Sequence, residues 1–272
     1  MMRIAASAVA ALLVGQLAAP AAAKGWPTPA AGDSTSGGPE LILTFDDGPN
    51  LKTTPEVLDT LAKHHLHAIF FLVGNMADRK NKKIKPLFDR MIREGHILAT
   101  HTMTHENLCR KKVTDEQAAA EIDDGKKTVD DIADIRTMWF RTPYGVRCDR
   151  VEKLLAERHL EHFHWDIDPQ EWKHPEVDRA VKYVTGQLEK NSDRVVLLMH
   201  DVKVVTTKAL PQILDWIDAE NVKRLAVHKK PIRIVNGYEL AAERLPQGLV
   251  SWLGSITPDW GGLSGAVAGD LP

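Results

Sequence analysis

The sequence predicts an α/β fold in which a mainly parallel sheet forms a distorted or incomplete barrel. Apolar, strand-like runs alternate with longer helical patterns from residue 41 onward, as in repeated strand-helix units. There are about seven such units, and no glycine-rich nucleotide fingerprint follows the first run, which favours a barrel over an open dinucleotide-binding sheet. Composition agrees, because 43% of the 272 residues are hydrophobic and 26% are charged, as in ordinary globular proteins.

The expected elements follow one another regularly along the chain. Short apolar runs predict strands at residues 41–45, 67–73, 96–100, 138–140, 161–167, 194–199 and 231–235. Longer patterns predict helices at residues 54–63, 83–94, 114–134, 149–158, 176–190 and 207–219. Because a helical stretch separates most successive strands, neighbouring strands are expected to be parallel.

The two ends of the chain differ in composition from its middle. Residues 1–23 have one arginine, a short apolar centre and a small-residue end, which is the layout of a cleavable secretory signal. The apolar run is too short for a membrane anchor, so we expect no stable membrane span after cleavage. Residues 24–38 are rich in Gly, Pro, Ser and Thr and predict a linker, and residues 245–272 are expected to form a C-terminal tail. The protein is therefore expected to be secreted or periplasmic.

Charge and cysteine content indicate which partners and which compartment suit the protein. The formal net charge is −2 at pH 7, and nothing in the chain suggests a nucleic-acid partner. Cys109 and Cys148 are the two cysteines, and each follows a polar motif by a few residues. In an oxidising compartment they can form a disulfide, and two free thiols are the alternative that stays open.

Polar residues gather where the predicted strands end. In a barrel the carboxyl ends of parallel strands meet on one rim, which is where barrel enzymes carry their active sites. We therefore expect the following residues to converge there: Asp46 and Asp47, His101, Arg141, Asp166 and Asp168, and His200.

The segment "HTMTH", residues 101–105, can bind a metal ion together with one of two neighbouring aspartates. If the segment makes a helical turn, His101 and His105 lie on one face and both rings can reach one cation. Two histidines and an aspartate give three protein ligands and leave a position for water, as in catalytic zinc sites. Asp46 and Asp47 point in different directions at a strand end, so one can bind the metal while the other removes a proton from the water.

Two further motifs can complete such a site. In "RTPYG", residues 141–145, Arg141 can hold a carboxylate ionised, and a backbone N–H of the turn can face a developing oxyanion. In "LLMHD", residues 197–201, His200 can act as a general acid if a nearby carboxylate raises its pKa. A solvated surface arginine and a hydrogen-bonded core histidine are the alternatives.

Five motifs together resemble those of the polysaccharide deacetylases, carbohydrate esterase family 4: "TFDDGP", "HTMTH", "RTPYG", "DIDPQEW" and "LLMH", in this order and spacing. The resemblance covers roughly residues 40–240 and makes residues 39–244 the catalytic domain. It implies a distorted (β/α) barrel that uses one divalent metal ion to remove N- or O-acetyl groups from an acetylated polysaccharide or oligosaccharide. Zinc is the first expectation, and cobalt, manganese and nickel are accepted by the same ligand types.

The resemblance also implies a role for each matching residue. In catalysis it implies Asp46 as the base, Arg141 as its partner and His200 as the acid. As metal ligands it implies Asp47, His101 and His105.

Substrate contacts follow from the same resemblance, and one position departs from it. The Tyr144 amide is implied at the oxyanion, Trp172 at the wall of the groove and Leu198 in the acetyl pocket, although Trp172 can also be a core residue. The fourth motif carries Glu171 where the family has a second aspartate that tunes the acid histidine. Either Glu171 still reaches His200 or Asp168 takes this role, and we favour Asp168.

Two other functions are alternatives. A glycoside hydrolase on a similar barrel uses two carboxylates across a glycosidic bond and does not need the histidine pair. A non-catalytic glycan-binding protein on a deacetylase scaffold is expected to lack the base or the acid, whereas Asp46 and His200 are both present.

Overall fold

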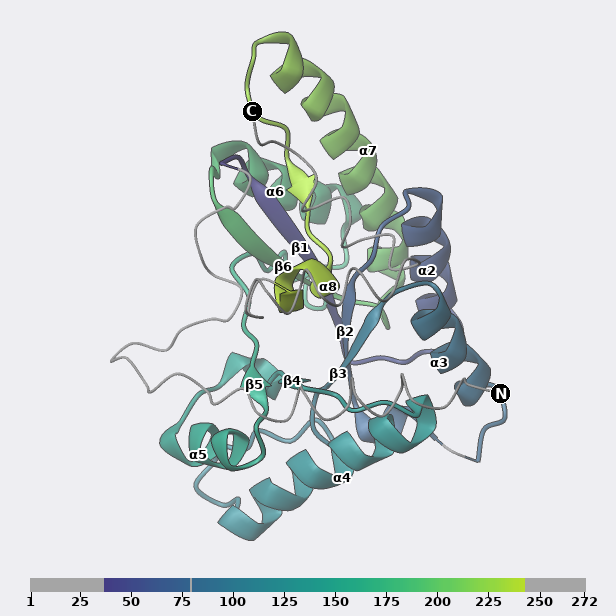
Figure 1. The fold of residues 1–272 in the computed structure, drawn as a ribbon, viewed down its shortest axis with the longest axis vertical. Helices are drawn as coiled ribbons and strands as arrows, with labels where there is room; N and C mark the ends of the chain where they lie inside the picture. The colour runs from purple at the N-terminus through teal and green to yellow at the C-terminus, as the bar shows by residue number, and fades with distance from the viewer. Residues whose placement is uncertain (1–36, 79, 243–272) are drawn as a thin grey trace, which may run out of the picture.

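The computed structural model describes residues 37–78 and 80–242, in which a seven-stranded sheet carries helices on its outer side (Figure 1). Every strand pair is parallel, and the strand order is β5-β4-β3-β2-β1-β6, with β7 also paired to β1. The strands are β1 Glu40–Asp46, β2 Ile69–Leu72, β3 Ile97–Thr100, β4 Trp139–Phe140, β5 Glu161–His162, β6 Arg194–His200 and β7 Arg233–Ile234. The predicted parallel sheet is confirmed, whereas the predictions for residues 1–23 and 245–272 and for most of the linker lie outside the described residues.

The helices follow the predicted alternation with strands. They are α2 Thr53–Lys63, η2 Gly74–Met76, α3 Ile84–Arg93, α4 Asp115–Ala133, η3 Pro143–Gly145, α5 Asp149–Glu157, α6 Val177–Lys190, α7 Val204–Ala226 and α8 Gly237–Ala242. Helix α4 begins with a capping box, in which the side chains of Thr114 and Gln117 each accept the other residue's backbone N–H. Helix α7 is longer than predicted, and α8 was not predicted at all. Among these described helices, none is sufficiently long and apolar to cross a bilayer.

Alternation along β1 separates two layers of the core. Leu41, Leu43 and Phe45 belong to the large apolar cluster beneath the helices, which also contains residues of α2, α3, α6 and α7. Ile42 belongs to a second cluster on the other face of the sheet, with aromatic residues such as Phe71. Successive side chains of a strand point to opposite faces, so one strand supplies both layers.

The curved sheet is nearly closed by a bridge between the segment after β5 and strand β6. Ile167 pairs with Leu197 in an isolated parallel bridge, and the Leu198 N–H donates to the Ile167 carbonyl at 2.9 Å. Only Glu161 and His162 of the predicted strand 161–167 are ladder-paired with β4. The Asp166 carboxylate accepts the Val196 N–H at 2.8 Å. The segment after His162 is therefore no longer paired with β4 and contacts β6 through side-chain and backbone hydrogen bonds. The expected incomplete barrel is therefore confirmed.

The amino end of the barrel is closed by α8 and by buried charges. Leu240 of α8 packs with Ile42 and Ile69 in the inner cluster. The fully buried Glu40 carboxylate is 2.7 Å from Arg194 of β6 and 2.9 Å from Arg233 of β7. These contacts fill the amino mouth and leave the carboxyl rim for the polar residues.

Candidate metal centre and active site

Asp46 and Asp47 lie at the carboxyl end of β1. Asp46 is the last residue of the strand and is buried. Asp47 has a φ of 74°, in the left-handed region that aspartate tolerates better than most residues, so the chain turns immediately after the strand. The two carboxylates therefore reach different partners, as their position at a strand end predicted.

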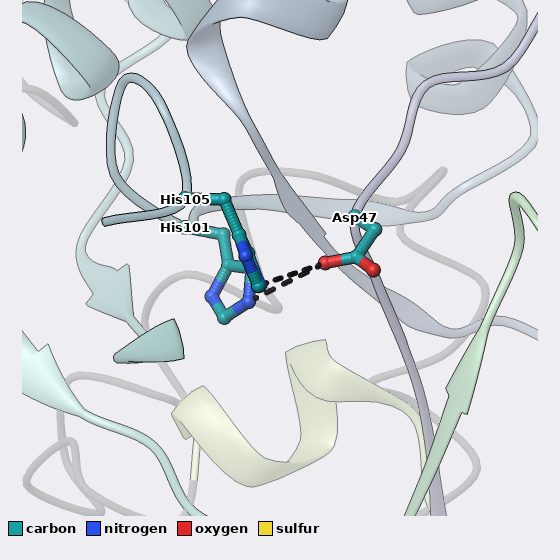
Figure 2. A group of neighbouring side chains, drawn as sticks. All are labelled: Asp47, His101 and His105. Carbon is teal, nitrogen blue, oxygen red and sulfur yellow. Dashed lines mark ion pairs between the residues drawn. The ribbon is translucent and has the colours of Figure 1, made fainter. Parts of the chain in front are cut away.

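Asp47, His101 and His105 bring their side chains together from two loops (Figure 2). Asp47 Oδ1 lies 3.2 Å from Nε2 of His105 and 3.7 Å from Nε2 of His101. One ligand atom from each residue lies within 4.8 Å of the others, and within residues 37–78 and 80–242 this is the group found with such a geometry. Atoms this close can bind a single cation.

The two histidines meet without the helical turn that their spacing suggested. Residues 101–105 form an irregular loop in which Thr102 and His105 have φ values of 66° and 63°. The His105 N–H donates to the Thr102 hydroxyl at 2.9 Å, which closes the loop. The helical expectation is wrong, because local hydrogen bonding by threonine replaces the helix ladder. The two rings nevertheless face the same point.

The orientation and charge of these ligands fit a divalent cation. The His101 Nδ1–H donates to the Arg141 carbonyl at 2.7 Å, which leaves the Nε2 lone pair for the site. Burial lowers the pKa of His101 and so favours the neutral ring that a metal ligand requires. Asp47 Oδ1 is buried and accepts no hydrogen bond within the described part of the chain. A buried carboxylate oxygen directed at two imidazole nitrogens is the donor set of catalytic zinc and related ions.

The carboxylate of Asp47 is held ionised. Burial alone raises its pKa, but contact with His105 and the nearby rings of His101 and His200 lower it more, and the pKa lies well below its ordinary value. An anionic oxygen is thus available to a cation at neutral pH.

Asp46 makes an ion pair with a completely buried arginine. Arg141 Nη1 is 2.6 Å from Asp46 Oδ1 and also donates to the Thr44 hydroxyl at 2.9 Å. The guanidinium lies over the Phe71 ring, with 4.0 Å from its central carbon to the ring centroid. Asp46 Oδ2 is 3.7 Å from His101 Nε2, so this second oxygen faces the candidate metal ligands.

Tyr144 lies in the turn η3, directly after the buried Arg141, Thr142 and Pro143. Its φ of 62° makes the chain reverse sharply, and its side chain is 62% exposed. The Tyr144 ring meets the His105 ring edge to face, with centroids 4.8 Å apart. The turn that was predicted to face an oxyanion therefore lies beside a metal-ligand candidate.

Glu171, and not Asp168, is the hydrogen-bond partner of His200. Glu171 Oε1 accepts from His200 Nδ1 at 2.9 Å and from the His200 backbone N–H at 2.8 Å. The Asp168 carboxylate instead accepts the Gln170 N–H at 2.7 Å. The preference for Asp168 is wrong, because the longer side chain of Glu171 reaches the ring. The position of Glu171 in the fourth motif was the signal that identified it.

The environment of His200 favours its protonated form. Burial alone lowers its pKa, but the hydrogen bond and charge of Glu171, with further help from Asp46 and Asp47, raise it to about 9. His200 and Asp46 are register partners on adjacent strands, so both side chains leave the sheet at the same level. The structure therefore places the acid candidate and the base candidate on one rim.

The two expected apolar substrate contacts differ in exposure. Trp172 is 49% exposed on the loop after β5, which excludes the alternative of a core tryptophan. Leu198 is buried and is the register partner of Thr44, two residues before the rim. Trp172 is available to a ligand from solvent, and Leu198 forms part of the inner wall.

Asp201 is a buried carboxyl that the sequence reasoning did not single out. Burial raises its pKa to about 7, with a further contribution from the charge of Asp47. The Thr54 hydroxyl donates to its Oδ2, and a Cβ on Gly48 would collide with the same oxygen. Its place directly after His200 at a strand end was the available signal. Asp201 thus packs against the backbone of the turn that follows Asp47.

Cys109 and Cys148 form a disulfide, with 6.0 Å between their Cα atoms. Cys109 belongs to the loop that follows His105, and Cys148 immediately precedes α5 in the loop that contains Tyr144. The bond therefore joins the loop of two metal-ligand candidates to the loop of the oxyanion candidate.

Comparison with known proteins identifies one family. A sequence model described as polysaccharide deacetylase matches residues 33–162. The chitooligosaccharide deacetylase of Sinorhizobium fredii is 37% identical over 170 residues, which are 62% of this chain and 74% of that protein. The peptidoglycan-N-acetylglucosamine deacetylase of Bacillus cereus is 32% identical over 161 residues, 59% of this chain and 55% of that protein. Among solved structures, peptidoglycan deacetylase PdaC from Bacillus subtilis superposes with a TM-score of 0.64 at 26% identity, covering 80% of this chain and 96% of that one.

Proposed function

Because the chain belongs to the polysaccharide deacetylase family, we propose that it is a metal-dependent hydrolase that removes acetyl groups from a glycan containing N-acetylglucosamine. The observation that carries this proposal is the group of Asp47, His101 and His105 beside the separate carboxylate of Asp46. A glycosidase has no need for such a group, and a binding protein has no need for the Asp46 and His200 pair.

Asp47, His101 and His105 hold the metal ion in this proposal, and zinc suits their donor atoms best. A divalent cation bound there supplies Lewis acidity toward the acetyl carbonyl and lowers the pKa of a water molecule. The ionised Asp47 and the neutral His101 are ready to serve as ligands without losing a proton.

Asp46 is the base that removes a proton from the attacking water. The buried ion pair with Arg141 fixes one of its oxygens, so the other, Oδ2, is the one directed at the site. As the water oxygen bonds to the acetyl carbon, negative charge develops on the carbonyl oxygen. The Tyr144 N–H is the donor that stabilises this charge, because the turn that carries it lies against His105.

His200 is the acid that protonates the leaving nitrogen. The carbon-nitrogen bond breaks as the proton moves from the ring to the sugar nitrogen, so acetate and a free amine are the products. Glu171 keeps the ring protonated and oriented before this step. In the same proposal Trp172 stacks against the sugar and Leu198 lines the acetyl pocket.

The disulfide supports a secreted or periplasmic location, because such bonds persist in oxidising compartments. The predicted signal at residues 1–23 agrees with this location.

The decisive experiment measures acetate release from N-acetylated chitooligosaccharides, peptidoglycan fragments and acetylated xylan, with and without a chelator. Acetate release that stops on metal removal and returns with zinc is expected, while chain length stays constant. New reducing ends would instead indicate glycosidic cleavage. Asp46→Asn is expected to abolish acetate release and to keep the bound metal, which separates the base from the ligands.

A further inference from the structure

A second polar network lies behind the turn that carries Tyr144. His162 is buried at the end of β5, and its Nδ1–H donates to the Glu152 carboxylate of α5 at 2.7 Å. Its Nε2 is hydrogen-bonded to the Thr142 hydroxyl at 2.9 Å. Arg147 donates to the same Glu152 oxygen at 2.9 Å. None of the roles proposed above uses these residues.

Thr142 transmits this network to the turn itself. The single hydroxyl hydrogen of Thr142 can be donated to the Val146 carbonyl, 2.7 Å away, or to His162 Nε2, 2.9 Å away, so the hydroxyl contacts both groups. Thr142 and Val146 are the residues on either side of Pro143–Gly145, so this contact spans the base of the turn. Tyr144 inside it has a left-handed φ of 62°, which is unfavourable for a residue with a large side chain and must be maintained by its surroundings.

The opposite side of the turn is closely packed. A Cβ placed on Gly145 would lie 2.5 Å from the Trp165 ring and 3.0 Å from the His164 ring. The turn is thus held between an aromatic surface and the hydrogen bonds of Thr142. A displacement of His162 or Thr142 therefore moves the backbone N–H groups of this turn relative to the metal-ligand candidates.

We propose that His162, oriented by Glu152, is a positioning residue that holds the Thr142–Val146 turn in the conformation required for oxyanion stabilisation. This inference rests on the proposed function for its catalytic consequence. His162 touches neither the candidate metal ligands nor the proposed base in the contacts described here, so it acts through Thr142. Charge on the oxyanion develops only on the way to the transition state, so loss of this support lowers kcat more than it raises KM.

Two variants of His162 distinguish its contact with Thr142 from its contact with Glu152. In His162→Gln the amide lies near the former position of Nε2 and can still reach Thr142, whereas in His162→Asn it lies near Nδ1 and reaches only Glu152. With N-acetylchitotetraose as substrate, His162→Asn is expected to lower kcat roughly 10- to 100-fold with KM within about twofold. His162→Gln is expected to recover most of kcat. Equal kcat values in the two variants would overturn the proposal.

A double-mutant cycle tests the path through Thr142. Thr142→Val removes the hydroxyl with little change of shape and is expected to lower kcat to the same extent as His162→Asn. The double variant is expected to be no slower than either single variant, because both remove one support. Additive losses would show that His162 acts by another route.

His96→Asn is the matched control. His96 is equally buried, accepts the Ala68 N–H through Nδ1 at 3.2 Å, and precedes β3 at the opposite end of the barrel. This variant is expected to lower the melting temperature while kcat is unchanged.

Hydrogen exchange provides a readout that does not require activity. The peptide containing residues 142–146 is expected to exchange faster in His162→Asn and Thr142→Val than in wild type or His96→Asn. Unchanged exchange would overturn the proposed support even if kcat fell. If wild type released no acetate, faster exchange would still establish the support of the turn, and the proposed function alone would fail.

Discussion

Asp46 and Asp47 are neighbours in the chain, and both approach His101, but their closest partners differ. Asp46 continues the strand geometry of β1 and pairs with the buried Arg141, whereas the positive φ of Asp47 turns its carboxylate toward two imidazoles. One change of backbone conformation between two identical residues thus separates a carboxylate held by Arg141 from one that faces two imidazoles. In the proposed mechanism, this separation allows a ligand and a base to come from adjacent positions.

Glu171 is expected to set the pH range of activity through His200. His200 must be protonated to serve as the acid, so activity falls as pH rises through its pKa, which Glu171 raises. Glu171→Gln removes the carboxylate charge, and the alkaline limb of the kcat profile is expected to shift to lower pH. Measured at pH 8, the loss of kcat is expected to be roughly 10-fold or more, since each pKa unit changes the protonated fraction tenfold above the pKa.

Asp168→Asn is the control for this shift, because Asp168 bonds the Gln170 amide and not His200. Its alkaline limb is expected to shift less than that of Glu171→Gln, because the Asp168 carboxylate acts on His200 only through its charge. A shift in this variant, with none in Glu171→Gln, would contradict the assigned pairing.

At the scale of elements, the seven strands of the described residues all coincide with predicted apolar runs, but the extent of β5 was not predictable. Residues 41–45 and 194–199 were recognised because β1 and β6 are buried on both faces and read as continuous apolar runs. The run 161–167 looks like one strand, yet only two residues pair with β4 because Asp166 bonds the β6 backbone through its side chain. Helix α8 escaped prediction because its six residues give too little periodicity.

Part of the candidate site was likewise predictable from the sequence, and part was not. Its residue types were readable because they follow strand ends, and parallel strands bring those ends together. The conformation of 101–105 and the choice of Glu171 over Asp168 depend on tertiary hydrogen bonds between loops. Such contacts leave no periodic pattern in the sequence.

The charged cluster of β1, β6 and β7 leads to a prediction about stability. Burial alone raises the pKa of Glu40, but the hydrogen bonds and charges of Arg233 and Arg194 lower it to about 2. A lowered pKa in the folded state means that this stabilisation is present above about pH 4.5 and is lost as pH falls toward 2.

Glu40→Gln is expected to reduce the free energy of unfolding by about 3 kcal/mol near neutral pH, because it leaves the two arginines without the buried charge. The slope of stability against pH between about 4.5 and 2 is also expected to decrease. Urea unfolding at several pH values measures both effects. Since Glu40 lies at the amino end, kcat below the melting transition is expected to match wild type, and a lower kcat there would contradict this separation.

For the whole molecule, the disulfide is the covalent link between distant loops. Its half-cystines are 39 residues apart, and closing a loop of this length restricts the unfolded chain by about 4 kcal/mol in the chain-entropy description. Cys109→Ser/Cys148→Ser is expected to lose stability of this order in urea unfolding. Wild type treated with a reductant is expected to unfold like the variant, and an unchanged midpoint in both would refute the assignment.

The division of the barrel between a charged, helix-plugged amino mouth and a polar carboxyl rim has a practical consequence for engineering. Substitutions that raise thermal tolerance can be confined to the mouth around Glu40 and α8, while loops such as those of Tyr144 and Trp172 are varied to accept other glycans. The two sets of changes share no direct contacts among those described, so a robust scaffold can be optimised first and its selectivity diversified afterwards.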